Sequence, residues 1–312
     1  MVCLMSLALA LLAIPTVVWL VTYFVPILLV TILPPQNLKK KYNAEWALVT
    51  GGGTGIGKAL VEALAEQGLS VVIVSLDDKF LAETYQSVSE RYAGQKFRKV
   101  GVTFAPEVKY MDKIKEATKD IKIQCVFNNA GFIVTGFFDS SPEGKQMVNM
   151  ECNATAAANV THHFVGRMVR EKLKGCIVFT SSVVAYTPSP FSVMYGATKA
   201  FVSSMAVSLG VEVRARGIDV LAVHPSPVSS NFYDNLDHKI ELMDQATKSA
   251  VPPSTLPREI FKSIGRVAWR DIGGMAVGVR VGTKMLSYNA LGTVFAMMAP
   301  TLPDYRKNDV GR

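Results

Sequence analysis

The sequence predicts an α/β fold, a single domain built on a doubly wound parallel sheet, with an apolar membrane segment before it and membrane-associated helices after it. Two patterns carry this prediction. Short β-rich runs alternate with longer helical patterns through the middle of the chain, which is typical of parallel strands with helices on both faces. At the N-terminus, residues 1–38 contain no Asp, Glu, Lys or Arg.

The composition fits a folded chain of this kind. Of 312 residues, 49% are hydrophobic and 19% are charged, which excludes intrinsically disordered and low-complexity proteins. The four cysteines lie far apart, and none of the four histidines has metal-ligand spacing, so we expect no metal site and no disulfide framework. The net charge is +8, yet nothing resembles a nucleic-acid-binding surface, and we expect no nucleic-acid partner.

Residues 1–38 form the predicted membrane anchor. The stretch from Leu4 to Leu33 is almost continuously apolar and exceeds the roughly 20 residues that a helix needs to cross a bilayer. Three lysines follow at positions 39–41 with no basic residue before them, which favours a cytosolic location for the rest of the chain. Pro15 and Pro26 are compatible with one kinked span or with a hairpin that returns to the same face.

Residues 39–257 form the predicted globular domain. Its β-rich runs predict six strands, which cover Trp46–Thr50, Ser70–Ser75, Phe97–Val102, Ile123–Asn128, Cys176–Thr180 and Asp219–His224.

A glycine-rich loop follows the first of these strands. The run Gly51-Gly52-Gly53-Thr54-Gly55-Ile56-Gly57 leads directly into a helical pattern over residues 58–67. Glycines let the backbone turn tightly and let a pyrophosphate approach the helix N-terminus, where free N–H groups and the helix dipole favour anions. With a strand before it, a helix after it and a second strand beyond, the loop predicts a Rossmann-like dinucleotide site.

Four motifs occur in order between Ala44 and Tyr233. They are T-G-x-x-x-G-x-G at Thr50–Gly57, N-N-A-G at Asn128–Gly131, a strand-ending Thr180-Ser181-Ser182, and Y-x-x-x-K at Tyr195–Lys199. With these motifs in this order, the chain resembles the short-chain dehydrogenase/reductase family.

The catalytic chemistry follows from the residue types. Tyr195 and Lys199 are four residues apart on a predicted helix, so their side chains share one face. A tyrosine has an ordinary pKa near 10, and a nearby ammonium group is expected to lower it toward the range useful for proton transfer. Ser182 lies thirteen residues before Tyr195, the family's serine-to-tyrosine spacing, and would orient and polarise a substrate carbonyl.

The resemblance implies two further roles. Lys199 would hold the hydroxyls of the nicotinamide ribose. The family's fourth catalytic residue is an asparagine, for which Asn149 and Asn153 are candidates. We choose Asn153 because Thr161 follows it by eight residues, and it would hold a water that links Lys199 to solvent.

The resemblance also implies a nicotinamide dinucleotide, NAD(H) or NADP(H), with contacts spread over several loops. The expected cofactor-binding residues are Gly51, Thr54, Gly55, Ile56, Gly57, Ser75, Asp77, Asn129, Ala130, Gly131, Tyr195, Lys199, Pro225 and Val228. The loop at Pro225–Ser230 departs from the family's P-G-x-x-x-T because serines replace the glycine and the threonine. We still expect it to contact the carboxamide.

Cofactor choice is normally decided at the end of the second strand. A carboxylate there binds the ribose of NAD, whereas an arginine accepts the 2′-phosphate of NADP. Here Ser75 and Leu76 are neither, and Asp77 and Asp78 either face the ribose or cap the next helix. NADP(H) is therefore favoured by the family resemblance alone.

Residues 258–312 are expected to form a basic helix followed by an apolar segment. Arg258, Lys262, Arg266 and Arg270 recur every four residues, which predicts one face of a helix, either solvated or in contact with anionic headgroups or a phosphate-bearing substrate. Residues Met285–Pro303 are uncharged but barely long enough to span a bilayer. An interfacial or partly buried helix is the alternative.

Within the family, the apolar anchor and the residues around Tyr195 look most like membrane-anchored 3-ketoacyl-CoA reductases and 17β-hydroxysteroid dehydrogenases. The likeness implies hydride transfer between NAD(P) and the carbonyl or hydroxyl of a lipid, at the endoplasmic reticulum membrane, with a cytosolic catalytic domain and a homodimer as one possible state. The alternatives are another lipid ketone, such as 3-ketodihydrosphingosine or a retinoid, and a catalytically silent nucleotide-binding subunit.

Overall fold

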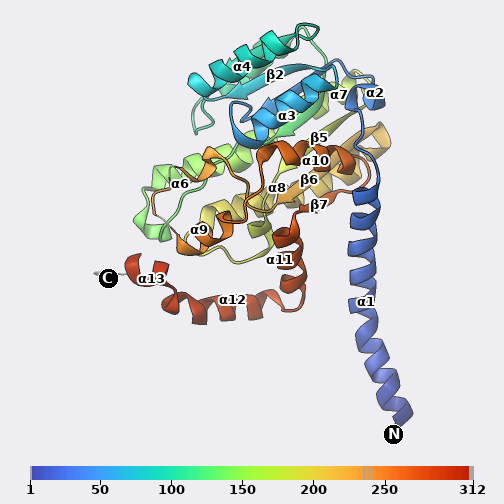
Figure 1. The fold of residues 1–312 in the computed structure, drawn as a ribbon, viewed down its shortest axis with the longest axis vertical. Coiled ribbons are helices and arrows are strands. Elements are labelled where there is room, and N and C mark those ends of the chain that lie inside the picture. Colours follow the sequence, from blue (N-terminus) through green and yellow to red (C-terminus); the bar gives the residue numbers. More distant parts are fainter. Residues whose placement is uncertain (1, 235, 239, 309–312) are drawn as a thin grey trace.

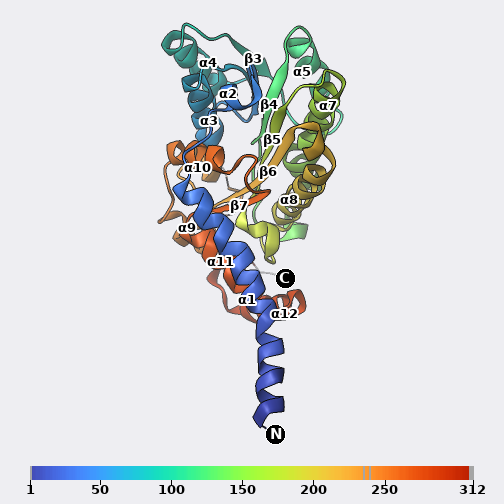
Figure 2. The same cartoon turned by 90° about the vertical axis from the view of Figure 1, so that its right-hand side faces the viewer.

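The predicted fold class is confirmed by the computed structural model, which describes residues 2–234, 236–238 and 240–308. Seven parallel strands form one sheet in the order β3-β2-β1-β4-β5-β6-β7, with helices on both faces (Figures 1 and 2). The strands are β1 (Trp46–Thr50), β2 (Ser70–Ser75), β3 (Phe97–Gly101), β4 (Ile123–Asn128), β5 (Gly175–Thr180), β6 (Ile218–Pro225) and β7 (Trp269–Ile272).

Helices cover the sheet in two layers (Figure 2). One layer holds α3 (Gly55–Glu66), α4 (Lys79–Arg91) and α10 (Leu256–Ser263), and the other holds α5 (Tyr110–Thr118), α7 (Ala156–Arg170) and α8 (Val193–Val213). Because side chains alternate along a strand, Val49 packs into the core with α3 and α10 while Leu48 packs into the core with α5 and α7.

Shorter elements lie between these helices and strands or at the ends of the fold. They are α2 (Leu38–Tyr42), η1 (Phe138–Ser140), α6 (Glu143–Met150), η2 (Glu151–Thr155), η3 (Val183–Tyr186), η4 (Arg214–Arg216), η5 (Asn231–Tyr233), α9 (Glu241–Thr247), η6 (Pro253–Thr255) and η7 (Ala299–Thr301).

The strand order reverses between β1 and β4. The chain runs outward from β1 through β2 to β3, then returns to place β4 on the other side of β1. In an open parallel sheet, the loops at such a reversal diverge and leave a crevice beyond the carboxyl ends of the strands. The glycine-rich loop after β1 and the loop after β4 both lie at this crevice.

The N-terminal apolar segment forms one continuous helix, α1 (Val2–Ile32), which includes both Pro15 and Pro26. The hairpin alternative is therefore not the structure that forms. Helix α1 extends well beyond the globular body (Figure 1). Within the described part of the chain, its segment Ala13–Ile32 is the one helix long and apolar enough to cross a membrane, by length and composition.

The prediction of one basic helix from Arg258 to Arg270 is wrong in its second half. Helix α10 ends at Ser263, and Gly265 adopts a left-handed φ of +73°, which turns the chain out of the helix. Arg270 lies in β7, which pairs with β6 and was not predicted. The four basic residues therefore do not share a helix face.

Three of these basic residues instead contact the end of α1 or the residues just after it. Lys262 and Arg270 are both buried, and both pair with Glu259 at N–O distances of 3.0 and 3.3 Å. Lys262 Nζ also donates to the Thr31 carbonyl at 3.0 Å, and Arg266 Nη1 donates to the Pro34 carbonyl at 2.9 Å. Cations beside the last carbonyls of a helix satisfy those groups and complement the helix dipole.

The C-terminal segment folds into short helices. Helix α11 (Gly274–Lys284) runs beside α1, and α12 (Tyr288–Met298) leads away from α1 before the short α13 (Pro303–Asn308) (Figure 1). With 11 residues, α12 is too short to span a bilayer, so no spanning helix forms from Met285 to Pro303. This region leaves apolar side chains exposed at Met285, Leu286, Tyr288, Met297 and Met298.

Candidate active site

The glycine-rich loop has the backbone that a dinucleotide site requires. Gly51 and Gly55 adopt left-handed φ angles of +65° and +53°, where a side chain would be strained. A Cβ on Gly57 would overlap the Gly51 carbonyl, so this position also requires glycine. Thr54 caps α3 with extended backbone and without a side-chain hydrogen bond to the helix, which leaves the first-turn N–H groups without a side-chain cap. The loop therefore fits a pyrophosphate.

The Asn-Asn-Ala-Gly loop after β4 is fixed against the glycine-rich loop. Thr50 Oγ1 accepts hydrogen bonds from the backbone N–H groups of Asn129 and Ala130 at 3.0 and 3.1 Å. Thr180 Oγ1 donates to Asn129 Oδ1 at 3.1 Å, which ties the loop to the end of β5. The structure thus brings Asn129, Ala130 and Gly131 together with the loop after β1.

The end of β2 separates the roles of its two aspartates. Asp78 caps α4, since its Oδ1 accepts from the Leu81 N–H at 3.0 Å. The Asp77 side chain lies against the backbone of Gly101, because a Cβ on that glycine would come within 2.6 Å of Asp77 Cγ. Asp78 is therefore the cap of α4, and Asp77 lies at the edge of the dinucleotide crevice, beside Ser75.

Tyr195, Lys199 and Ser182 meet beyond the end of β5. Tyr195 and Lys199 are one turn apart on the buried face of α8, and Lys199 Nζ lies 5.5 Å from the centre of the Tyr195 ring. Ser182 caps η3, and its side chain hydrogen-bonds the Tyr195 side chain. Ser181 points elsewhere and donates to the Lys199 carbonyl at 2.9 Å. This geometry favours Ser182 over Ser181 as the serine that faces a substrate.

Asn153 lies in η2, a single π-helical turn between α6 and α7. Such turns occur frequently at functional sites. Asn153 Oδ1 accepts from Phe132 N–H at 2.9 Å, and its Nδ2 donates to the Phe132 carbonyl at 2.8 Å. A Cβ on Gly131 would lie 3.1 Å from Asn153 Oδ1 and 3.3 Å from Lys199 Nζ, which places these two groups around the same glycine. Asn149 also binds the Phe132 carbonyl, at 2.8 Å.

Burial controls the proton affinities at this site. Desolvation lowers the pKa of Lys199 to about 8, while its Nζ donates to the Thr180 carbonyl at 2.9 Å. Desolvation raises the pKa of Tyr195 well above its usual value, the nearby Tyr233 raises it further, and the hydrogen bond from Ser182 lowers it. The direction of the Tyr195 pKa is therefore upward, opposite to the lowering predicted from the spacing of Tyr195 and Lys199, because burial of the phenol is the largest contribution.

The sequence did not identify the two aromatic residues that cover Tyr195. The rings of Tyr195 and Phe232 are 5.8 Å apart, and Tyr233 follows in the same turn, η5. Ser230 caps η5 and lies beside Gly55, since a Cβ on that glycine would come within 3.1 Å of Ser230 Cβ. Their position in the sequence could have indicated this, because they directly follow the Pro225–Ser230 loop, which is expected to contact the cofactor.

That loop also explains one departure from the family pattern. Ser226 Oγ accepts from the Ala276 N–H at 3.1 Å and so satisfies the first turn of α11. Pro225 ends β6, and Val228 is buried and forms an isolated bridge with Val251.

In the described part of the chain, no group of three or more His, Cys, Asp or Glu residues could hold a metal ion.

A parallel sheet with this crevice, and with a tyrosine, a lysine, a serine and an asparagine beside it, defines a dinucleotide-dependent oxidoreductase. A sequence profile described as short chain dehydrogenase matches residues 45–241. The chain belongs to the short-chain dehydrogenase/reductase family.

Relatives within the family act on lipid-like molecules. The chain is 32% identical to 17-beta-hydroxysteroid dehydrogenase type 3 of Mus musculus over 232 residues, which cover 73% of this chain and 74% of that protein. It is 31% identical to very-long-chain 3-oxoacyl-CoA reductase of Homo sapiens over 227 residues, which cover 71% and 69%.

Solved structures share the fold. A structure from a study of 7beta-hydroxysteroid dehydrogenase stereoselectivity superposes with a TM-score of 0.73 at 23% identity, and the match covers 82% of this chain and 98% of that one. A short-chain dehydrogenase/reductase from Burkholderia phymatum in complex with NAD gives a TM-score of 0.66 at 22% identity, with coverage of 77% and 93%.

Proposed function

We propose that this protein is a membrane-bound reductase that transfers hydride from a nicotinamide dinucleotide to the carbonyl of a lipid, either a 3-ketoacyl-CoA or a steroid. One observation carries the proposal: Tyr195, Lys199, Ser182 and Asn153 converge at a dinucleotide crevice in a chain that also carries a long apolar helix. The relatives that act on steroids and very-long-chain 3-oxoacyl-CoA support the substrate class.

The side chains divide the reaction between them. The bound dinucleotide supplies the hydride. Ser182 orients the carbonyl oxygen, and Tyr195 donates a proton to that oxygen as the carbonyl becomes an alcohol. Burial raises the pKa of Tyr195, so the phenol carries the proton that reduction requires at neutral pH. Lys199 would hold the ribose hydroxyls, and Asn153 would hold a water that connects Lys199 to solvent.

The dinucleotide would be held by the residues of the three loops at the crevice. The glycines, Thr54 and Ile56 of the first loop would take the pyrophosphate, Ser75 and Asp77 the adenosine ribose, Asn129–Gly131 the central part, and Pro225 and Val228 the carboxamide. The family resemblance favours NADP(H), whereas a carboxylate at Asp77 favours NAD(H).

Asp77 provides a direct test of cofactor preference. We expect Asp77→Asn to shift the ratio of NADPH to NADH affinity toward NADPH by about tenfold, since it removes an anion that repels the 2′-phosphate. Asp78→Asn is the matched control, because asparagine retains the cap of α4 while the same charge is lost one residue further on. Binding is measured by nucleotide fluorescence. An equal change in both variants would show that Asp77 does not face the ribose.

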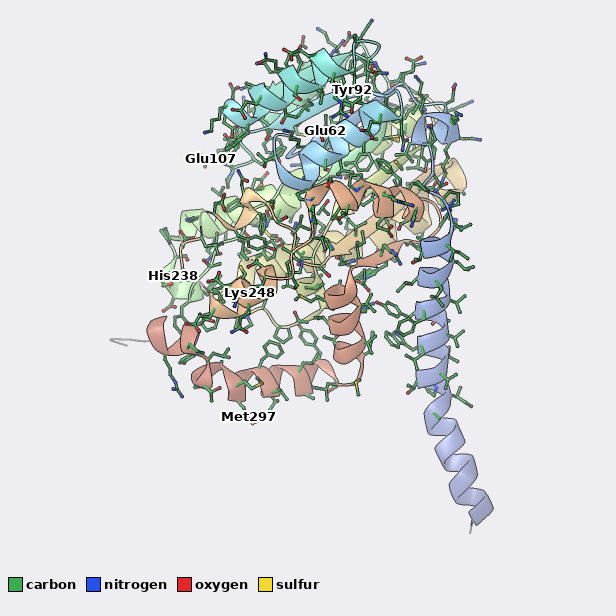
Figure 3. The ribbon with its side chains drawn as sticks, in the orientation of Figure 1. Glu62, Tyr92, Glu107, His238, Lys248 and Met297 are labelled. Atoms are coloured by element: carbon green, nitrogen blue, oxygen red, sulfur yellow. The ribbon has the colours of Figure 1, made fainter. Side chains whose placement is uncertain are left out.

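We extend the proposal to the membrane. Residues 1–38 would anchor the chain in the endoplasmic reticulum with the catalytic domain in the cytosol. Helix α12 would lie at the bilayer surface, because its exposed apolar side chains include Met297, which points away from the sheet (Figure 3). Two copies would pair through α8, which leaves Phe201, Val207 and Val211 exposed.

The deciding experiment follows the oxidation of NADPH and NADH by the detergent-solubilised full chain, after confirming that it stays with membranes in alkaline carbonate. We expect turnover with a 3-ketoacyl-CoA or a 17-ketosteroid. Turnover of neither, with nucleotide binding retained, would contradict these substrates and direct the search to 3-ketodihydrosphingosine and retinoids. Failure to bind either nucleotide would contradict the enzyme proposal and favour a silent structural subunit.

A further inference from the structure

A series of neighbouring polar side chains, buried except for Tyr23 at its outer end, joins the apolar helix α1 to the catalytic helix α8. Tyr23 Oη of α1 donates to Asp271 Oδ2 of β7 at 2.8 Å. Asp271 Oδ1 lies 3.6 Å from His224 Nδ1 of β6, which is too long for a hydrogen bond, and this buried nitrogen has no hydrogen-bond partner among the described residues. His224 Nε2 and Ser203 Oγ of α8 are 2.9 Å apart, and Ser203 Oγ donates to the Lys199 carbonyl at 2.7 Å.

The middle of this series is buried, and the Trp269 side chain joins Asp271 to His224. Asp271, His224 and Ser203 are each no more than 2% exposed. Asp271 also accepts hydrogen bonds from Tyr186 Oη and Trp269 Nε1 at 3.1 and 3.3 Å, and the Trp269 ring stacks on His224 with centroids 4.1 Å apart. Buried polar groups are costly unless they are paired, so the loss of one member should disturb its neighbours.

Ser203, at the α8 end of this series, contacts both segments that carry catalytic residues. Ser203 is one turn beyond Lys199 on α8, and the Ser203 and Ser181 hydroxyls are 2.7 Å apart. Ser181 also donates to the Lys199 carbonyl at 2.9 Å and directly precedes Ser182. Movement at Ser203 would therefore displace the backbone that places Lys199 and Ser182.

We propose that Tyr23, Asp271 and His224 are positioning residues, through which the docking of α1 on the globular body sets the positions of Lys199 and Ser182. The part of α1 from Tyr23 onward is then part of the support of the active site. This inference rests on the proposed function, because its effect on turnover presupposes the chemistry of Tyr195 and Lys199.

This series of side chains predicts a specific pH dependence of kcat. The titratable or charged groups around Asp271 are Tyr23 from α1, Tyr186 from η3, His224 from β6, Arg280 from α11 and Arg270 from β7 itself. Burial raises the pKa of Asp271, and the hydrogen bonds from Tyr23 and Tyr186 lower it. Loss of the Tyr23 hydroxyl therefore raises the pKa of Asp271 and moves the acid limb of kcat to higher pH.

His224 does not contribute to that limb. Desolvation lowers the pKa of His224 to about 3, so its ring stays neutral over the working pH range. The acid limb that moves in a Tyr23 variant then reports on the carboxylate of Asp271.

The test compares Tyr23→Phe with Thr22→Val in the full chain, reconstituted in lipid nanodiscs. Thr22 is the matched control because its hydroxyl donates to the Val18 carbonyl within the same helix, at 2.7 Å. We expect Tyr23→Phe to lower kcat about fivefold, with KM for the nucleotide within twofold, and to shift the acid limb upward. Hydrogen exchange of the amides at 199–203 should become faster. Thr22→Val should match the wild type in every measurement.

Hydrogen exchange separates this inference from the proposed function, since it needs no substrate. Faster exchange at 199–203 in Tyr23→Phe alone would support the positioning chain even in a preparation that reduces no ketone tested. Unchanged exchange together with an unchanged pH profile would overturn it. Equal effects of Tyr23→Phe and Thr22→Val would also overturn it, because they would show a general weakening of α1.

Discussion

Replacing Tyr195 with phenylalanine is expected to lower kcat about 10³-fold while nucleotide affinity stays within about twofold. The phenol hydroxyl is the proton donor of the proposed reaction, and phenylalanine retains the ring but not the proton. The ring packs against Phe232 with centroids 5.8 Å apart, a contact that phenylalanine preserves, so the fold should not change. Steady-state oxidation of NAD(P)H and nucleotide fluorescence titration measure the two quantities.

Tyr92→Phe is the matched control for this substitution. Tyr92 donates to Glu66 at 3.2 Å on the surface beside α3 and α4, outside the crevice. We expect its kcat to equal that of the wild type. If Tyr195→Phe kept more than a tenth of the turnover, the proton donor would be another group, and Tyr233 would be the next candidate because it lies close enough to raise the Tyr195 pKa.

The sequence predicted the parts of this protein that local patterns encode. The glycine-rich loop and the Tyr195–Lys199 pair depend on residues close together in the chain, and so does the burial of strands such as β1, in which every residue is buried. Asn153 could be chosen over Asn149 in the same way, and the structure places its side chain around Gly131 together with Lys199.

The missing parts depend on contacts between distant segments. Strand β7 is only four residues long and carries Arg270 and Asp271, which is a weak hydrophobic pattern for a buried strand. Both charges are buried because Glu259 pairs with the arginine and Tyr23 donates to the aspartate, nearly 250 residues away in the chain. No pattern of nearby residues in the sequence predicts these partners.

The direction of the Tyr195 pKa shift was missed for the same reason. Spacing along a helix predicts that Lys199 is near, but it does not reveal how completely both groups are removed from water. Lys199 is 4% exposed and Tyr195 is 8% exposed. Desolvation favours the neutral form of each group, so the phenol holds its proton more tightly although a lysine lies nearby.

Burial of Lys199 also predicts that the enzyme is less stable than it would be without this lysine. Lys199→Met should lower kcat at least 10²-fold, since the ammonium that would hold the ribose is lost. It should also raise the free energy of unfolding at pH 7 by about 1–3 kcal/mol. The charged group costs about 3 kcal/mol to bury when its pKa falls from 10.5 to about 8, and the lost bond to the Thr180 carbonyl returns about 1 kcal/mol of that.

The pH dependence of stability identifies the cause of that gain. Below about pH 8, Lys199 is protonated in both the folded and the unfolded chain, and the cost of burial is constant. Between pH 8 and 10.5 the unfolded chain binds more protons, so wild-type stability rises with pH relative to Lys199→Met, and the difference between the two closes. Thermal unfolding of the nucleotide-free protein from pH 6 to 10 measures this window. Lys115→Met, on the exposed surface of α5, should follow the wild type throughout. A constant difference across the window would mean that methionine stabilises the fold by packing alone, and that the charge of Lys199 is not held at a cost.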